Sequence, residues 1–354
     1  MRTVQQIVDA TRVGGQRLAA PRYTPREGPR LALAVASMQT HTTDEGWQLM
    51  DGLRAGGYKL CGRGERVDIG CVQVGSILSD YKPGTLLLQD KREWLGRTAG
   101  KGFDHSEQFL STSELQHHSD VFKGYVLKDA HSDQALHSGC AIDICCHFWV
   151  VYYDKRLVAA TAPFAREEHM VRTYHGVDAG TVPAFHVGRK NAALLSGAVS
   201  GAYPLRQRLA KAQLSGSLPN VDYLKHPGYG RSRCYTKDYL WTLSQYKVAI
   251  CTSSRFGYAV RKIIEATACG CRVITDLPVD EVLPGIDANL VRVDVGIATA
   301  DLSILVHELC TSWDAGRQTV FADLAKELYD YRALGAKLSA DIELLRGAYN
   351  VGTP

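Results

Sequence analysis

The chain has 354 residues, of which 45% are hydrophobic and 22% charged, with a formal net charge of +4. This composition is typical of a globular protein long enough for two domains, and it excludes an intrinsically disordered chain. The small positive charge permits an anionic ligand but does not indicate a nucleic-acid-binding protein. Because no apolar run approaches about 18 residues, no membrane span is expected.

The N-terminal sequence lacks the apolar core of a signal peptide, so we expect a cytoplasmic protein. The ten cysteines show neither a disulfide framework nor paired Cys-x-x-Cys spacing. Cys140, Cys145, Cys146 and His147 are therefore interpreted as buried core residues rather than metal ligands. We expect reduced thiols and no bound metal.

The first half of the chain predicts an α/β layered domain over residues 31–178, preceded by a segment rich in arginine and proline. That segment, 1–30, is either a loosely packed tail or a basic arm that contacts phosphates. A helix is predicted near 45–55, ending at Gly56. The strands are predicted at 31–36, 58–61, 67–74, 85–90, 125–129 and 157–161.

The second half predicts another α/β domain over 184–298, after a Gly- and Pro-containing linker near 176–183. Its apolar strand runs suit a parallel sheet buried on both faces. Strands are predicted at 191–196, 221–226, 248–252 and 290–294, and helices at 204–214 and 239–246. Residues 299–354 are predicted to form helices that can pack back on the first domain. The fold class is therefore α/β, with two Rossmann-like domains, parallel sheets and C-terminal helices.

The most informative segment runs from Arg255 to Asp276 in the order polar loop, helix, glycine stop and strand. Lys262 and Glu265 are three residues apart, so they share one face of the helix. A cation suits phosphates and a carboxylate accepts hydrogen bonds from ribose hydroxyls. The pair therefore predicts binding of a nucleoside diphosphate.

This segment resembles the donor-binding motif of GT-B glycosyltransferases. The matching residues are Glu265-Ala-Thr-Ala-Cys-Gly270, followed by Val273 and Ile274. A generic Rossmann-like helix also explains the glycine and the buried strand, so that interpretation stays open. The resemblance implies that residues 190–295 hold the nucleotide part of a nucleotide sugar.

Strand ends in the second domain supply the other donor-side candidates, because ligands of open α/β sheets bind at the carboxyl ends of strands. Gly197 lies in a small-residue loop that lets the backbone approach phosphates. Arg206, near a helix start, is either an anion ligand or a surface arginine. His226 is either a phosphate or base contact or a plain turn residue. Ser253 and Arg255 complete the donor-side set.

The acceptor side is assigned to the first domain. Asp90 is the first candidate for a general base and His131 the second. Asp90 also suits a helix cap. Trp94 suits stacking on a sugar or base face of the acceptor. No Asp-x-Asp motif occurs in the chain, so we expect no metal requirement. Gly257 stands where the retaining subset has a second glutamate, which leaves retention or inversion open.

The resemblance implies a glycosyltransferase, hexosyl or pentosyl, that moves a sugar from a nucleoside-diphosphate sugar, with UDP-sugar as first choice. The acceptor is a hydroxyl of a glycan, or of a hydroxymethylated DNA base as in phage enzymes. Two alternatives stay open: a nucleotide-sugar epimerase of the same fold, and a non-catalytic nucleotide-binding protein. An epimerase would turn over its donor without an acceptor. The oligomeric state is left undetermined.

Overall fold

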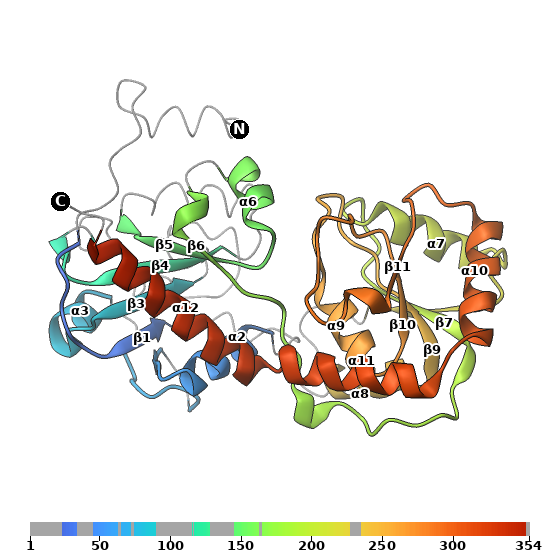
Figure 1. Cartoon of the computed structure of the whole chain (residues 1–354), viewed down its shortest axis with the longest axis horizontal. Helices are drawn as coiled ribbons and strands as arrows, with labels where there is room; N and C mark the ends of the chain where they lie inside the picture. The colour runs from blue at the N-terminus through green and yellow to red at the C-terminus, as the bar shows by residue number, and fades with distance from the viewer. Residues whose placement is uncertain are drawn as a thin grey trace, which may run out of the picture. The chain divides into compact units, whose positions relative to one another are not determined.

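The computed structural model describes residues 23–33, 45–62, 65–71, 74–89, 115, 117–127, 145–162, 165–226 and 235–351. These residues form two compact units, each built on one parallel sheet (Figure 1). Unit 1 holds the described residues of 23–33, 49–174 and 335–351, and unit 2 holds those of 45–48 and 175–334. The α/β fold class with two parallel sheets, expected from the sequence, is confirmed.

The sheet of unit 1 has six parallel strands in the order β2-β1-β3-β4-β5-β6. Every residue of β4 and β5 is buried, as expected for a parallel sheet covered on both faces. The strands are β1 (Arg30–Leu33), β2 (Lys59–Cys61), β3 (Thr85–Gln89), β4 (Phe122–Leu127), β5 (Phe148–Val151) and β6 (Met170–Arg172). The associated helices are α2 (Glu45–Ala55), α3 (Val74–Tyr81), α6 (Lys155–Thr161) and the short η4 (Glu167–His169).

Two strands predicted in this unit are wrong. Residues 157–161 belong to helix α6, because the side chain of Asp154 caps the amide of Arg156 at 2.9 Å and starts a helical turn. Residues 67–71 make a single bridge to β2, and Val74 begins helix α3. The apolar residues at this point are buried at helical spacing rather than alternating. Strands β5 and β6 were not predicted.

The sheet of unit 2 has five parallel strands in the order β11-β10-β9-β7-β8. The strands are β7 (Lys190–Gly197), β8 (Val221–Lys225), β9 (Tyr246–Ile250), β10 (Arg272–Thr275) and β11 (Leu290–Arg292). The helices are α7 (Pro204–Leu214), α8 (Tyr235–Ser244), α9 (Arg261–Ala268), α10 (Thr299–Thr311) and α11 (Ala315–Leu328), with short turns η5 (Ala179–Thr181) and η6 (Asp287–Asn289). The predicted strands and helices of this half are confirmed, with shifts of a few residues at their ends.

One core cluster of unit 2 joins α7 and α10 to the same face of the sheet. It includes Leu205 and Leu209 of α7, Leu302 and Val306 of α10, and inward residues of β7, β9 and β10. Helices α8 and α11 each pack beside α9 (Figure 1). Helix α9 ends at a glycine stop, Gly270, whose φ of +80° suits a left-handed cap. Strand β10 therefore starts directly behind it and runs back through the sheet.

Helix α12 (Tyr331–Val351) contributes its residues from Gly335 onward to unit 1. There Leu338 and Ile342 are buried. The Ser339 hydroxyl donates to the carbonyl of Gly56 at 2.7 Å and accepts from Arg30 at 2.8 Å. These contacts tie the last helix to the turn after α2 and to the start of β1.

Candidate functional site

The described candidate site lies in unit 2, where β7, β8 and β9 reach their carboxyl ends. The chain leaves these strands at Gly197, His226 and the segment 251–254. In parallel α/β sheets these ends lie along one edge, where backbone amides and side chains can surround a ligand. Four of the residues predicted from the sequence meet here, namely Gly197, Arg206, His226 and Lys262. We call these four the cation cluster.

Gly197 lets the end of β7 lie directly against two cations. Its φ is +113°, in the region that L-residues with side chains avoid. A Cβ added at this position would lie 2.7 Å from Nη1 of Arg206 and 3.1 Å from Cε of Lys262. Glycine is therefore needed both for the backbone conformation and for the close approach of the two basic side chains.

Arg206 connects the loops that follow β7 and β9. Its side chain is 3% exposed. Nε donates to the Thr252 hydroxyl at 3.1 Å, Nη2 to the Thr252 carbonyl at 3.3 Å, and Nη1 to the Ala198 carbonyl at 3.2 Å. Burial lowers the pKa of Arg206, although a guanidinium stays charged at neutral pH. The alternative of a surface arginine is therefore wrong, since the side chain is buried.

Lys262 carries an ammonium group that the described residues leave without a hydrogen-bond acceptor or an ion-pair partner. Nζ lies 4.1 Å from the centroid of the Tyr239 ring. Burial lowers the pKa of Lys262, with the nearby carboxylate of Glu265 acting in the opposite direction. A cation taken from water without a counter-ion is unfavourable unless a ligand completes its coordination. This arrangement indicates a binding site for an anion.

His226 follows β8 and lies within electrostatic range of Lys262 and Arg206. Its pKa is lowered by burial first, and then by the positive charges of Lys262 and Arg206. The imidazole is therefore largely neutral at pH 7 in the free protein. A contact of His226 with phosphate or base stays a prediction.

Glu265 does not pair directly with Lys262. Its carboxylate Oε1 lies 2.8 Å from Nε of Arg261, one turn earlier on α9, and both side chains are nearly buried. The structure thus separates the two charges of the predicted pair. Glu265 pairs with Arg261, whereas the Lys262 side chain lies against the ring of Tyr239. Binding of ribose by Glu265 stays a prediction.

Ser253 and Arg255 lie in the loop after β9. Ser253 is 2% exposed, and its amide donates to Oδ1 of Asp276 at 2.5 Å. Arg255 is exposed and packs its guanidinium against the ring of Phe256 at 4.9 Å. Ser253 is therefore buried and hydrogen-bonded within the fold, whereas Arg255 lies at the surface of unit 2.

Sequence reasoning missed three residues beside the cation cluster. Tyr203 and Tyr239 place their rings against Arg206 and Lys262, at 4.0 and 4.1 Å. Asp276 follows β10, and burial raises the pKa of its carboxyl group. The only signal for Tyr203 is its spacing of three residues from Arg206. No sequence spacing links Tyr239 to Lys262, because they belong to different helices.

The acceptor-side predictions Asp90, Trp94 and His131 lie outside the described residues. Across the described part of the chain, no group of three or more His, Cys, Asp or Glu side chains is arranged to hold a metal ion. The helices that the structure describes also include none that is both long and apolar enough to cross a membrane.

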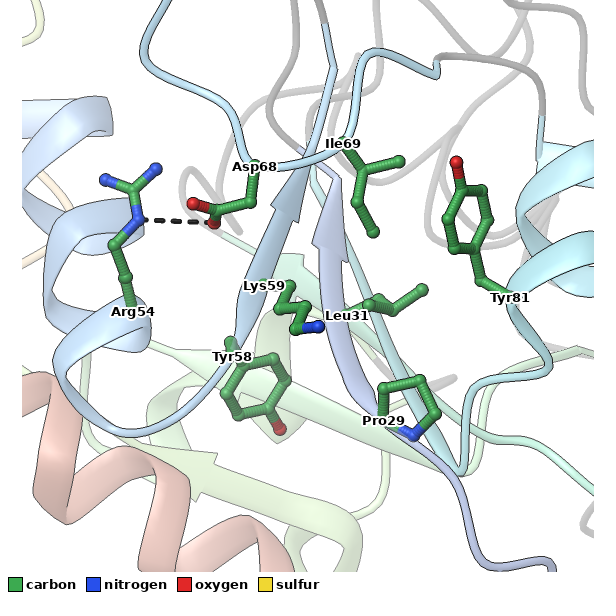
Figure 2. A pocket seen from close by; sticks show the side chains of 8 residues that line it. All are labelled: Pro29, Leu31, Arg54, Tyr58, Lys59, Asp68, Ile69 and Tyr81. Carbon is green, nitrogen blue, oxygen red and sulfur yellow. Dashed lines mark hydrogen bonds and ion pairs between the residues drawn. The ribbon is translucent and has the colours of Figure 1, made fainter.

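Unit 1 contains a surface pocket between β1, β2 and the ends of α2 and α3 (Figure 2). Leu31, Tyr58 and Lys59 line it at the amino ends of the two strands, opposite to the usual ligand edge. Its Arg54 and Asp68 are bonded to each other at 3.2 Å. Because Arg54 and Asp68 are paired and Lys59 is exposed to solvent, the pocket is a weaker candidate for an anionic ligand than the cation cluster.

Two Rossmann-like units with parallel sheets define the GT-B class of fold. No family model and no curated protein matches the sequence. Solved structures do match. A sucrose-phosphate synthase from Thermosynechococcus elongatus has a TM-score of 0.56 and 12% identity, over 91% of this chain and 100% of that one.

Two further structures have the same fold. Anabaena Alr3699/HepE, solved with UDP, has a TM-score of 0.55 and 11% identity over 90% of this chain and 100% of its own. A glycosyltransferase from Rickettsia africae ESF-5 has a TM-score of 0.51 and 10% identity over 94% of this chain and 100% of its own. At this level of identity the likeness establishes the fold and not the activity.

Proposed function

We propose that the protein is a glycosyltransferase that binds the diphosphate of a nucleoside-diphosphate sugar at the cation cluster. The observation that carries the proposal is the Lys262 ammonium, which has no acceptor among the described residues and lies beside Arg206 and Gly197. A diphosphate supplies the missing acceptors, and the amides at the uncapped start of α9 add further donors. GT-B neighbours support transfer as the type of reaction.

In the proposed reaction an acceptor hydroxyl oxygen bonds to the anomeric carbon of the sugar. The bond between that carbon and the β-phosphate oxygen breaks, and the hydroxyl proton passes to a base. The nucleoside diphosphate leaves with one additional negative charge. Arg206 and Lys262 are fixed where this charge develops, so they stabilise the transition state more than the bound donor.

The role proposed for Glu265 is to accept hydrogen bonds from the ribose hydroxyls with the carboxylate oxygen that Arg261 leaves free. Arg206 also stiffens the site, because its hydrogen bonds to Thr252 and Ala198 hold the loops after β7 and β9 together. Asp90 and His131 are proposed as bases on the acceptor side, with Trp94 as a stacking surface for the acceptor.

A uridine nucleotide is the first probe to try, since HepE was solved with UDP and with UDP and glucose. We would measure thermal stabilisation by UDP, GDP, ADP, CMP and TDP sugars. A ligand of the folded state raises stability by about 2.7 kcal/mol at a hundredfold excess over its dissociation constant. Lys262→Met should reduce the shift strongly, because it weakens binding of the diphosphate. Lys211→Met, which removes an exposed lysine of α7, should leave it unchanged.

Product analysis then tests the reaction. Transfer requires release of the nucleoside diphosphate that depends on an added acceptor. Turnover of the donor without acceptor would instead favour an epimerase, and binding without turnover would favour a nucleotide-binding protein. Absence of binding by every nucleotide sugar would contradict the proposal. A DNA acceptor is distinguished from a glycan by a DNA gel shift at two ionic strengths, because phosphate contacts give steep salt dependence.

A further inference from the structure

Each of the two basic side chains of the site, Arg206 and Lys262, lies on the face of a tyrosine ring. Cζ of Arg206 is 4.0 Å from the ring centroid of Tyr203, and Nζ of Lys262 is 4.1 Å from that of Tyr239. Neither cation has a carboxylate within ion-pair distance among the described residues. The rings attract the positive charges through their electron-rich faces.

Tyr239 is held firmly enough to position a neighbouring side chain. Its ring is 3% exposed, and its hydroxyl shares a hydrogen bond of 2.8 Å with the hydroxyl of Ser196, the residue before Gly197. Helix α8 is thereby anchored to the end of β7. Since Lys262 belongs to α9, the ring fixes the ammonium relative to β7 from a different element.

Tyr203 is fixed by the start of α7. It precedes Pro204, and its amide donates to the carbonyl of Ser200 at 3.0 Å. Arg206 lies one turn further on, so its guanidinium extends back over the ring. The ring covers one face of the guanidinium, while the Thr252 and Ala198 acceptors occupy positions around its edge.

The amino-terminal edge of the same sheet shows the opposite arrangement. Nζ of Lys190 lies 4.9 Å from the Tyr246 ring, but Asp222 is also present at 3.6 Å. There a carboxylate lies within ion-pair distance of the lysine. The ligand edge differs in that each basic side chain lies on an aromatic ring and, among the described residues, has no carboxylate within ion-pair distance.

We infer that Tyr203 and Tyr239 are positioning residues, which hold Arg206 and Lys262 in place by their ring faces and so leave both positive charges available to the donor diphosphate. A carboxylate in the same place would fix the cations equally well but would compete with the phosphates. A ring restricts the cationic side chain without cancelling its charge. Less side-chain conformational entropy is therefore lost when the ligand binds. This inference rests on the proposed function, and it adds the residues that pre-organise the site.

The test compares Tyr239→Leu with Tyr239→Phe by calorimetric titration with UDP and with uridine. Loss of the ring should weaken UDP binding about tenfold. Phenylalanine keeps the ring and loses the hydroxyl that bonds to Ser196, so it should restore most of the affinity. Uridine lacks phosphates, and its affinity should be the same in all three proteins. Tyr246→Leu removes a ring from the opposite edge and serves as the control.

A double-mutant cycle decides whether Tyr239 acts through the lysine. In the Lys262→Met background, Tyr239→Leu should have no further effect on UDP binding. Additive losses, or equal losses for UDP and uridine, would overturn the inference. If Tyr239→Leu does not fold, Tyr203→Leu at the half-buried ring is tested in the same way in an Arg206→Met background, because its ring lies against Arg206. Failure of the wild-type protein to bind any nucleoside diphosphate would overturn the proposed function instead, whereas normal binding by the leucine variants overturns only this inference.

Discussion

The two units treat their charged side chains differently. In unit 1, Arg54 donates to Asp51 at 3.1 Å, to Asp68 at 3.2 Å and to the carbonyl of Arg66 at 2.5 Å. Its donors are used within the fold. In unit 2, Lys262 has a ring beneath it and no acceptor among the described residues. A paired charge supports the structure around it, whereas an unpaired charge at a strand end is available to a ligand.

The comparison also separates the stability of the fold from its function. A partly exposed salt bridge adds a modest amount to the free energy of unfolding. An isolated cation in a half-buried position lowers stability and is retained where binding requires it. Removing the two kinds of charge should therefore have opposite consequences, and the following experiments test that expectation.

The largest effect is expected from Lys262→Met. Loss of a charge-assisted hydrogen bond to a phosphate costs about 1.5–3 kcal/mol, or roughly 10- to 100-fold in UDP affinity. The melting temperature should be unchanged or higher, because the variant no longer buries an unpaired ammonium. Calorimetry with UDP and a thermal melt without ligand measure the two quantities. A lower melting temperature with unchanged affinity would show that Lys262 is structural.

Gly197→Ala should lower both the free energy of unfolding and the affinity for UDP. The strained backbone conformation costs about 1–3 kcal/mol for a residue with a side chain. The added Cβ also meets Arg206 at 2.7 Å, so the guanidinium must move. Denaturant unfolding and UDP titration measure the two losses. Gly201→Ala is the matched control, since a Cβ there would meet open space. Equal behaviour of the two variants would contradict the close packing at Gly197.

Arg54→Met should lower stability and leave UDP affinity unchanged, which is the reverse of the result expected for Lys262→Met. Its three hydrogen bonds are partly exposed, so we expect a loss of about 1 kcal/mol in the free energy of unfolding. UDP affinity should stay within twofold of the wild-type value. The measurement is urea unfolding with calorimetry on the same preparation. A large change in UDP binding would mean that the pocket of unit 1 takes part in donor binding.

The smallest expected effect is on the pH dependence of stability. Because the pKa of His226 is lowered in the folded protein, the folded state binds fewer protons than the unfolded state just below pH ~6.5. Its contribution therefore makes stability rise with pH through that window and destabilises the protein as the pH falls. His226→Gln should flatten this part of the stability profile. His307→Gln, on helix α10, is the control, and an unchanged profile for His226→Gln would contradict the assignment.

Local patterns in the sequence were sufficient for most elements of unit 2. Pro204 at a helix start, the glycine stop at Gly270 and the apolar strand runs act over a few residues, and the structure follows them. The same reasoning failed at 157–161, where a short apolar run was predicted as a strand. A run of this length is equally compatible with a helix, and the cap at Asp154 decided the outcome.

The residues of the cation cluster could be named from the sequence because Gly197 and His226 follow apolar strand runs. Arg206 lies near a helix start, and Lys262 lies three residues from Glu265 on the next predicted helix. Their charge state could not be predicted, because it depends on which groups lie within a few ångströms after folding. Folding pairs Glu265 with Arg261 and places Lys262 on the ring of Tyr239, which belongs to another helix. Helical spacing alone allowed either partner for the carboxylate. Tertiary packing selected one of them and left the lysine as the charge open to a ligand.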